Sequence, residues 1–213
     1  MGDRATKKAA GGRDSYGRLR RRRRRGAVLL VVFALIALVA LLGALAAPEV
    51  VRRVMHPLEY EAEIRASAAE FGVEPSLVAA VIKTESRFDP DATSSRGAYG
   101  LMQLLPETAR FVSERTGISG DYRDPETNIR IGTRYLSYLH SRYDGDERLA
   151  LAAYNSGEGR VDRWISDENF DVSRDIPFAE TRDYVRNVTE SQRVYEDLYG
   201  ENLDQRPGLL PGS

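Results

Sequence analysis

The sequence predicts an all-α domain over residues 58–199, preceded by one apolar segment long enough to cross a membrane. Two observations predict the helical domain. Apolar residues recur at spacings of three and four between turn signals, and no stretch of useful length alternates with period two. The membrane segment is predicted by an uninterrupted apolar run over residues 26–47. With 213 residues, 42% hydrophobic and 30% charged, the chain can hold one compact domain and its appendages.

The apolar run GAVLLVVFALIALVALLGALAA has no charged side chain and would form a helix about 30 Å long. Residues 1–25 carry eleven Lys and Arg against two Asp, whereas the rest of the chain carries twenty basic and thirty acidic residues. The cluster Arg20 to Arg25 directly precedes the run. The positive-inside rule therefore predicts a basic, disordered cytoplasmic tail over 1–25, a transmembrane helix over 26–47 and every later residue on the outer face.

Other interpretations of this N-terminal region stay open. A run of arginines is also typical of segments that bind nucleic acid or anionic lipid, although its place beside an apolar span is explained by topology alone, and we expect no nucleic-acid partner. Ala44-Leu45-Ala46 resembles a signal-peptide cleavage site, but the apolar core would be unusually long for a signal peptide. We therefore expect an uncleaved anchor.

The first three predicted helices follow a linker over residues 48–57. The first, over 58–71, opens after a proline and stops before Gly72. The second, over 75–88, begins at Pro75 and ends before Asp89-Pro90, and the third, over 106–115, closes near Gly117. A long segment rich in small and polar residues joins the second and third helices. Such segments between helices are common places for sites.

The remaining predicted helices cover residues 125–143, 147–154 and 179–199. The fourth closes at Gly145 and carries Ile129, Tyr135, Leu136 and Leu139 on one side, and the fifth closes at Gly157. Residues 200–213 are predicted to be a disordered tail.

The composition excludes several kinds of chemistry. The absence of cysteine rules out disulfides, a cysteine nucleophile and a thiolate metal site. His56 and His140 are the only histidines and do not stand in a metal-binding spacing, so we expect no catalytic zinc and no cofactor. Asp89, Asp91 and Thr93 imitate the start of a calcium loop, but the glycine and the final glutamate of such a loop are missing.

Glu85 occupies a position where an amphipathic helix should carry an apolar side chain. Val78, Val81, Ile82 and Glu85 have the spacing of one helical face, which points toward the core. A carboxylate in such surroundings is normally paired, protonated or useful. An ion pair with a basic residue such as Arg87 or Arg96 would be the structural explanation. A raised pKa that suits a general acid would be the functional one.

Four motifs along the outer domain bear on this choice. They are ESxF from Glu85, GLMQLxP from Gly100, AYNxG from Ala153 and ETRxYV from Glu180, in this order. Together they resemble the soluble lytic transglycosylase family over roughly residues 58–199. The resemblance implies a goose-type lysozyme-like helical fold and a bacterial catalytic domain on the outer face of the cytoplasmic membrane.

The resemblance also implies an activity: cleavage of peptidoglycan glycan strands between N-acetylmuramic acid and N-acetylglucosamine. Glu85 matches the single catalytic acid/base of the family. It would protonate the leaving oxygen and then accept the proton of the muramyl C6 hydroxyl as that hydroxyl attacks C1, which leaves a 1,6-anhydromuramyl end. Most glycosidases need a second carboxylate. Here an intramolecular hydroxyl replaces water, so one carboxylate suffices.

Other residues match substrate-binding positions of the family, each with a structural alternative. Met102 could fill the core, Tyr154 and Asn155 could pack the end of a helix, Tyr184 could be a core residue, and the serines could serve turn chemistry. The residues assigned to substrate binding are Ser94, Ser95, Met102, Gln103, Tyr154, Asn155, Glu180 and Tyr184. Two other functions stay open: a muramidase that uses water, and a wall-binding scaffold without turnover.

Overall fold

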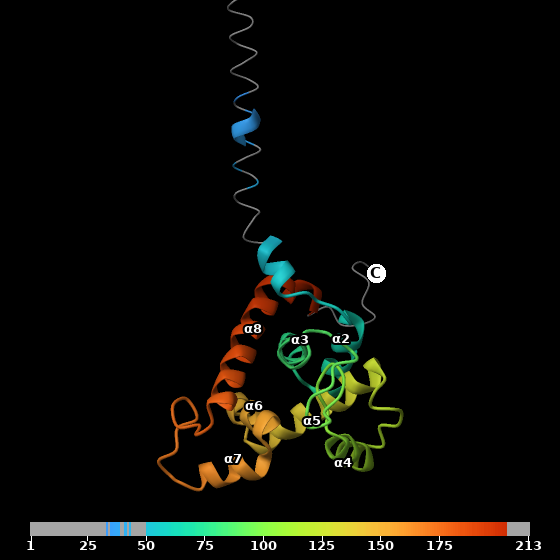
Figure 1. The fold of residues 1–213 in the computed structure, drawn as a ribbon, viewed down its shortest axis with the longest axis vertical. Helices are drawn as coiled ribbons and strands as arrows, with labels where there is room; N and C mark the ends of the chain where they lie inside the picture. Colours follow the sequence, from blue (N-terminus) through green and yellow to red (C-terminus); the bar gives the residue numbers. More distant parts are fainter. Residues whose placement is uncertain (1–32, 34, 39–40, 42, 44–49, 204–213) are drawn as a thin grey trace, which may run out of the picture. The chain divides into compact units, whose positions relative to one another are not determined.

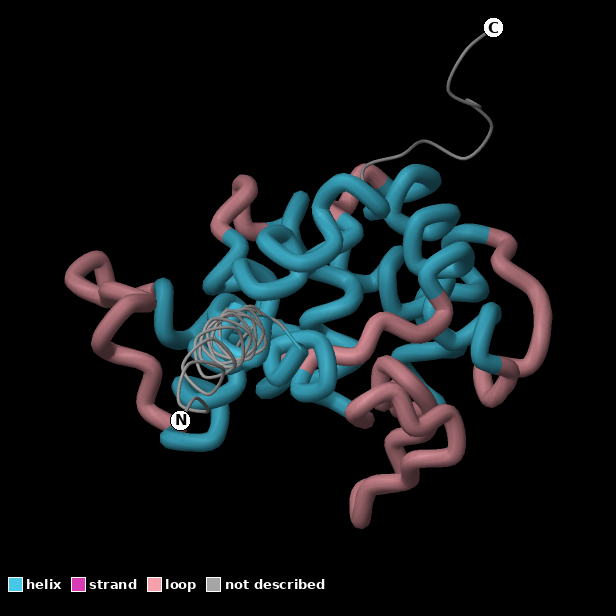
Figure 2. The backbone as a smooth tube through the Cα atoms, turned by 90° about the horizontal axis from the view of Figure 1, so that it is seen from above, coloured by secondary structure: helices cyan, strands magenta, loops and turns pink. Residues whose placement is uncertain are grey.

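The computed structural model describes residues 33, 35–38, 41, 43 and 50–203. The chain divides into two units between Arg52 and Arg53, and the second unit contains the predicted domain. Its helices are α2 (Glu61–Phe71), α3 (Pro75–Glu85), α4 (Pro106–Thr116), α5 (Pro125–Arg142), α6 (Glu147–Ser156), α7 (Glu158–Ile165) and α8 (Ala179–Leu203). The described part of the chain contains no strand, only two isolated bridges around Tyr99 (Figures 1 and 2), and the all-α prediction is confirmed there.

Local sequence explains where most helices begin. Proline occupies the first turn of α3, α4 and α5, where its missing N–H costs no helical hydrogen bond. Asp124 caps α5 by accepting a hydrogen bond from the Thr127 amide at 3.1 Å, and Asp146 caps α6 through the Leu149 amide at 3.0 Å. Each cap satisfies an amide that the helix itself leaves unpaired.

The helix predictions were incorrect in several details. The helix predicted over 58–71 begins only at Glu61. The helix predicted over 75–88 ends at Glu85, because Arg87 and Phe88 adopt positive φ angles of 56° and 66°. The sequence analysis missed α7, because Gly157 was interpreted only as the end of a helix. With φ 90° it ends α6 and also precedes the first residue of α7. The last helix continues to Leu203, four residues beyond its predicted end.

Helix α3 forms the centre of the domain. Its residues 76–82 are all buried, and Val78, Val81 and Ile82 have no exposed surface. Helix α8 packs along one side of α3 and α2 along another, while α5 packs against α2, α4 and α6 (Figure 1). A helix covered on several sides must be apolar around most of its circumference, which the sequence PSLVAAVI satisfies. Glu85, the last residue of α3, therefore lies at the end of a helix that runs through the interior of the domain.

The predicted cytoplasmic tail lies outside the described residues. So do the linker residues before 50, the tail residues after 203 and the predicted transmembrane segment, apart from residues 33, 35–38, 41 and 43. Among the residues that are described, no helix is both long and apolar enough to cross a bilayer.

Candidate active site

Glu85 is the last residue of α3, and its side chain lies mostly inside the domain. Burial raises the pKa of its carboxyl to about 7, and the nearby Tyr184 hydroxyl opposes this shift. No basic side chain of the described residues forms an ion pair with Glu85, and no neighbouring charge affects its pKa. The ion pair with Arg87 or Arg96 that the sequence left open is not formed. A carboxyl with this pKa can hold a proton near neutral pH and can also release it.

Two buried tyrosines lie close to this carboxyl. Tyr154, from α6, donates a hydrogen bond to the Met102 carbonyl oxygen at 2.8 Å. Tyr184, from α8, has a buried hydroxyl that makes no hydrogen bond of good geometry within the described chain. The pKa values of both hydroxyls lie well above the ordinary value, first because of burial and then because of the charge of Glu85. Both hydroxyls thus remain neutral beside the carboxyl, and because Tyr154 donates to Met102, only Tyr184 has a proton to offer to Glu85.

The segment between α3 and α4 is held against the end of α3 by side chains. The Ser86 hydroxyl lies 2.8 Å from the Leu101 carbonyl oxygen. Asn128, fully buried on α5, accepts a hydrogen bond from the Met102 amide at 2.8 Å and donates to the carbonyl oxygens of Tyr99 and Tyr122 at 3.0 and 2.8 Å. These contacts fix the backbone around Met102, and through it the hydroxyl of Tyr154.

Gly100 is required by this arrangement. Its φ is 82°, and a Cβ at this position would lie 2.5 Å from Asn128 Nδ2. The close approach of the backbone to the Asn128 amide is therefore possible only without a side chain. The glycine of the GLMQ motif therefore serves the conformation of the loop.

Met102 and Gln103 contribute mainly to the loop in this structure. The Met102 side chain has no exposed surface and packs on Gly132, whose Cβ, if present, would lie 2.4 Å from the sulfur. Gln103 has a φ of 47°, and its Nε2 donates to the carbonyl oxygens of Ala92 and Gly100, each at 2.9 Å. Their role in sugar binding stays a prediction. The Gln103 amide oxygen could accept a hydrogen bond from a sugar without breaking the two loop contacts of the amide nitrogen.

The two loop serines have different surroundings. Ser94 is half-buried, and its hydroxyl accepts hydrogen bonds from the amides of Ala98 at 3.0 Å and Arg96 at 3.3 Å. Ser95 is exposed. Asp91, which resembled a calcium ligand, accepts a hydrogen bond from the Tyr99 hydroxyl at 2.9 Å. In the part of the chain that the structure describes, no group of three or more His, Asp or Glu side chains is placed to hold a metal ion.

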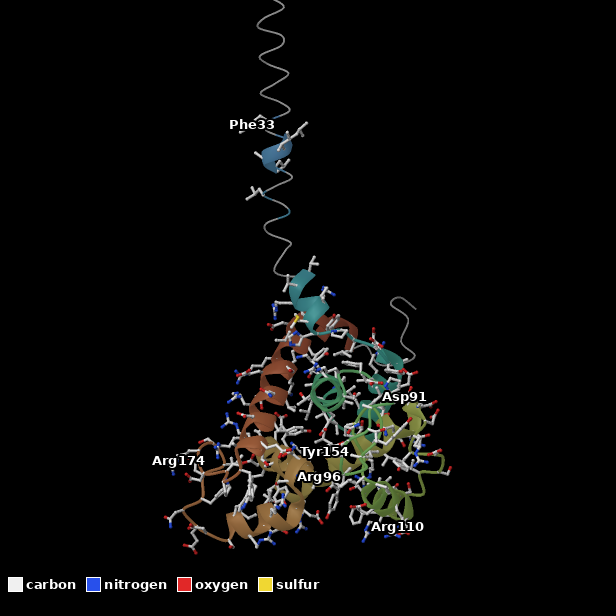
Figure 3. The ribbon with its side chains drawn as sticks, viewed as in Figure 1. Phe33, Asp91, Arg96, Arg110, Tyr154 and Arg174 are labelled. Atoms are coloured by element: carbon white, nitrogen blue, oxygen red, sulfur yellow. The ribbon has the colours of Figure 1, made fainter. Side chains whose placement is uncertain are left out.

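Asn155 and Glu180 lie together at one end of the site. Asn155 Oδ1 accepts a hydrogen bond from the Thr181 hydroxyl at 2.9 Å, and Glu180 is exposed in the first turn of α8. Both line a cavity of about 250 Å³, together with Arg96 from the loop between α3 and α4. In the projection of Figure 3, Arg96 and Tyr154 are drawn next to each other near the middle of the domain. The cavity brings together polar groups of three segments.

The structure thus brings Glu85, Tyr154 and Tyr184 together, with Asn155 and Glu180 at a nearby cavity. Sequence reasoning missed Asn128 and Thr181, which position the loop and Asn155. A signal for Asn128 exists in the sequence: it precedes Gly132 and Leu136 by four and eight residues, so a polar side chain lies on the buried stripe of α5. The Thr181 hydroxyl gave no comparable signal.

Comparison with known proteins identifies similar sequences. Residues 62–175 match the family model described as the transglycosylase SLT domain. A soluble lytic murein transglycosylase of Salmonella typhimurium is 36% identical over 152 residues, which covers 66% of this chain and 23% of that protein. A membrane-bound lytic murein transglycosylase C of Yersinia pestis is 37% identical over 161 residues, 62% of this chain and 45% of that protein.

A solved structure has a similar fold. The lytic transglycosylase Slt of Pseudomonas aeruginosa, crystallised as an inactive mutant, superposes with a TM-score of 0.66 at 39% identity and covers 72% of this chain and 26% of that one. The chain spans about a quarter of the length of the soluble curated relatives it matches, 23% to 25%.

Proposed function

Because the chain belongs to the transglycosylase SLT family, we propose that it is a peptidoglycan lytic transglycosylase with Glu85 as its only acid/base catalyst. The main support for the proposal is the environment of the Glu85 carboxyl and its raised pKa. The carboxyl is buried, it has no cation partner among the described residues, and its pKa is about 7. A single group of this kind can give a proton and take one back near neutral pH.

The proposed reaction uses Glu85 twice. The protonated carboxyl donates its proton to the oxygen that links C1 of N-acetylmuramic acid to C4 of N-acetylglucosamine, and the C1–O bond breaks. The carboxylate then accepts the proton of the muramyl C6 hydroxyl while that oxygen bonds to C1. No water is consumed, and Glu85 returns to its protonated state. The neutral hydroxyl of Tyr184 would orient the carboxyl between the two steps, whereas Tyr154 donates its hydrogen bond to the Met102 carbonyl oxygen and so supports the loop.

Within the described residues, no second carboxylate shifts the pKa of Glu85, and this supports an intramolecular acceptor. No described acid affects the pKa of Glu85, and Asp91 is engaged by Tyr99 in its turn. A hydrolase that inverts the sugar needs a second carboxylate to activate water, and a retaining one usually needs a carboxylate nucleophile. A tethered hydroxyl has a large effective concentration and needs less activation.

The remaining predicted residues are assigned to substrate binding in this proposal. Asn155 and Glu180 would contact the glycan or its peptide at the cavity that they share with Arg96. Ser94, Ser95 and Gln103 would contact the substrate along the loop between α3 and α4. Met102 would act through its backbone and its packing rather than through its side chain.

We also propose that residues 26–47 anchor the enzyme in the bacterial cytoplasmic membrane, with residues 1–25 inside and the domain outside. The support is the apolar run beside Arg20 to Arg25, and the membrane-bound relative from Yersinia pestis is consistent with it.

The test of the activity is the mass of the products released from purified peptidoglycan. We expect muropeptides with 1,6-anhydro ends, lighter by one water than hydrolytic products and resistant to borohydride reduction. Mainly reducible muramic acid ends would assign the domain to the muramidases instead. Binding to peptidoglycan without any released product would leave only a wall-binding role.

A further inference from the structure

A cleft of about 780 Å³ lies between the segment 53–57, the C-terminal half of α3 and the middle of α8. Its lining contains two cations, Lys83 and Arg87, and one carboxylate, Glu190. It lies on the opposite side of α3 from the catalytic carboxyl, because Lys83 precedes Glu85 by two positions, which is about 200° around a helix. The cleft is therefore separate from the site described above.

Neither cation of this cleft has a carboxylate partner. Within residues 50–203, Lys83 and Arg87 form no ion pair, and the only hydrogen bond of Lys83 Nζ is to the Ser191 hydroxyl at 3.3 Å. Burial lowers the pKa of the Lys83 ammonium, and the positive charge of Arg87 lowers it further. Glu190 in the same lining forms no ion pair with either cation within the described residues, so two positive charges face one negative charge and the partly buried Lys83 ammonium stays unpaired. The cleft thus has the electrostatics of an anion site.

Apolar side chains form the other part of the lining. Val54 and Met55 are 73% and 63% exposed, and Val194 from α8 lies nearby in the same cleft. Two exposed apolar side chains beside two unpaired cations suit a ligand that has both a phosphate and a hydrocarbon part. Free phosphate or a sugar phosphate would leave the apolar surface uncovered.

The position of the cleft in the chain indicates where such a ligand would come from. Val54 follows Ala47, the last residue of the apolar run, by seven residues, and seven residues span at most about 25 Å. If the run crosses the membrane, as proposed above, Val54 and Met55 stand close to the bilayer surface. Anionic phospholipid headgroups in that leaflet would attract Lys and Arg.

We propose that this cleft binds the headgroup of an anionic phospholipid, with the phosphate between Lys83 and Arg87 and the acyl region over Val54 and Met55. The bound lipid fixes how the catalytic domain stands on the membrane. Tyr195 and Tyr199 of α8 strengthen the connection, because their hydroxyls donate hydrogen bonds to the carbonyl oxygens of Pro57 and His56 at 2.7 and 2.9 Å. The segment beside the cleft is therefore tied to α8 and cannot move independently of the domain.

The first test uses short-chain lipids and does not depend on the anchor. The full chain in nonionic detergent is titrated by calorimetry with dihexanoyl phosphatidylglycerol, dihexanoyl phosphatidylcholine and inorganic phosphate. We expect saturable binding of phosphatidylglycerol that is about tenfold weaker in Lys83→Gln/Arg87→Gln, because charge-assisted contacts to the phosphate are lost. Phosphatidylcholine should bind at least about tenfold more weakly, because it carries no net charge.

The matched control is Arg110→Gln/Arg163→Gln, which removes the same charge from α4 and α7. Arg110 lies at the other end of the domain from the segment 53–57 (Figures 1 and 3). Equal loss in the two double variants, equal binding of the two lipids, or no saturable binding would overturn the proposal. Tight binding of inorganic phosphate alone would also overturn it and would indicate a plain phosphate site.

A second test examines orientation. The full chain is placed in nanodiscs of phosphatidylcholine with and without phosphatidylglycerol, and hydrogen exchange is followed in residues 187–194. Protection that requires phosphatidylglycerol and is lost in Lys83→Gln/Arg87→Gln supports the proposal, whereas unchanged exchange contradicts it. The proposal rests on membrane anchoring but not on catalysis. Failure of the chain to enter nanodiscs would refute the anchor, and failure to release muropeptides would refute the activity, each independently of the lipid titration.

Discussion

The Glu85 side chain is mostly buried and has no cation partner among the described residues. Both features determine what a substitution at this position should do. Glu85→Gln keeps the volume of the side chain but cannot donate and recover a proton. We expect release of muropeptides to fall by at least about a hundredfold, the lower end of what a general acid/base contributes. Asp91→Asn, which alters a carboxylate in the nearby turn, is the matched control and should retain most activity. A Glu85→Gln enzyme within tenfold of the unaltered one would contradict the mechanism.

The pKa of Glu85 also determines how activity depends on pH. The first step needs the protonated carboxyl, so kcat/KM should be constant below pH 7 and fall as the pH rises through about 7. Tyr184→Phe removes the neighbour that lowers this pKa, so the falling limb should move to higher pH. The measurement is the rate of release of soluble muropeptides between pH 4.5 and 9. A limb that stays in place in Tyr184→Phe would show that this hydroxyl does not act on the carboxyl.

The same ionisation contributes to stability. Its pKa rises from an ordinary 4.5 to about 7 on folding, so the native state binds more protons than the unfolded state between these values. The contribution of this carboxyl to the free energy of unfolding is therefore fully present below pH 4.5 and is lost as the pH rises through about 7. The loss amounts to about 3 kcal/mol at most. Glu85→Gln should be less sensitive to pH in this window and relatively more stable above it, as thermal unfolding at pH 4.5 and 8 would show. Parallel changes in both proteins would contradict the assigned pKa.

At the level of single residues, the sequence predicts the catalytic candidate because a carboxylate interrupts an apolar stripe. It does not predict how the neighbouring polar residues are used. Met102 and Gln103 stand in a motif that suggests contact with sugar, yet the structure uses the side chain of one and the amide nitrogen of the other to build the loop. Which polar group faces a ligand depends on backbone angles such as the φ of 47° at Gln103, and local sequence does not determine these.

Among the elements, the loop between α3 and α4 depends most on a residue outside it. From α5, Asn128 pairs with the Met102 amide and the Tyr99 carbonyl group of this loop, and it also donates to the Tyr122 carbonyl oxygen just before α5. Asn128→Ala leaves these groups unpaired in a buried place. We expect a loss of about 3 kcal/mol and a melting temperature lower by about 10 °C. Activity should fall as well, because the Met102 backbone orients Tyr154.

The matched control for this change is Asn169→Ala, since Asn169 lies in an exposed turn and its side chain contacts only Asp167. It should move the melting temperature by no more than about 2 °C. If Asn128→Ala were as stable as this control, the loop would not depend on the three hydrogen bonds.

Helices were predicted best where the sequence carries explicit end signals. Proline at the start of α3, α4 and α5 fixed those boundaries, and the buried stripe of α5 was identified correctly. The short helix α7 was missed because its eight residues bury only Val161, too little apolar surface to produce a periodic pattern. The early end of α3 was missed because Arg and Phe are not residue types that signal a positive φ, yet Arg87 and Phe88 both adopt one.

For the whole molecule, family and fold class were predictable from the order of four short motifs, because each motif lies at an element end that the fold brings toward Glu85. That the four motifs meet in space is a property of the tertiary structure. Their order along the chain predicts this only because it resembles the order in a known family. The electrostatics of the cleft at Lys83 had no counterpart in the sequence analysis. Lys83 belongs to α3, whereas Ser191 and Glu190 belong to α8, and only packing makes them neighbours.

The proposed topology makes a further prediction for the whole chain. The sequence contains no cysteine, so single cysteines placed at Ser15 and Ser166 can report sidedness without background. Ser166 is exposed in the structure, and Ser15 lies in the basic segment outside the described residues. In intact spheroplasts, a thiol reagent that does not cross membranes should label a cysteine at 166 and not one at 15.

Replacing Arg20 to Arg25 with serine should produce a mixture of orientations, in which the cysteine at 15 becomes partly labelled, because the positive charges hold this side in the cytoplasm. Replacing the same six residues with lysine keeps the charge and should keep the original pattern. The detergent-solubilised enzyme should release muropeptides equally well in all three forms, since the run is separated from the domain by the proposed anchor. Labelling of the cysteine at 15 in the unaltered chain would reverse the topology. It would also remove the basis for placing the cleft at Lys83 on the outer surface of the membrane.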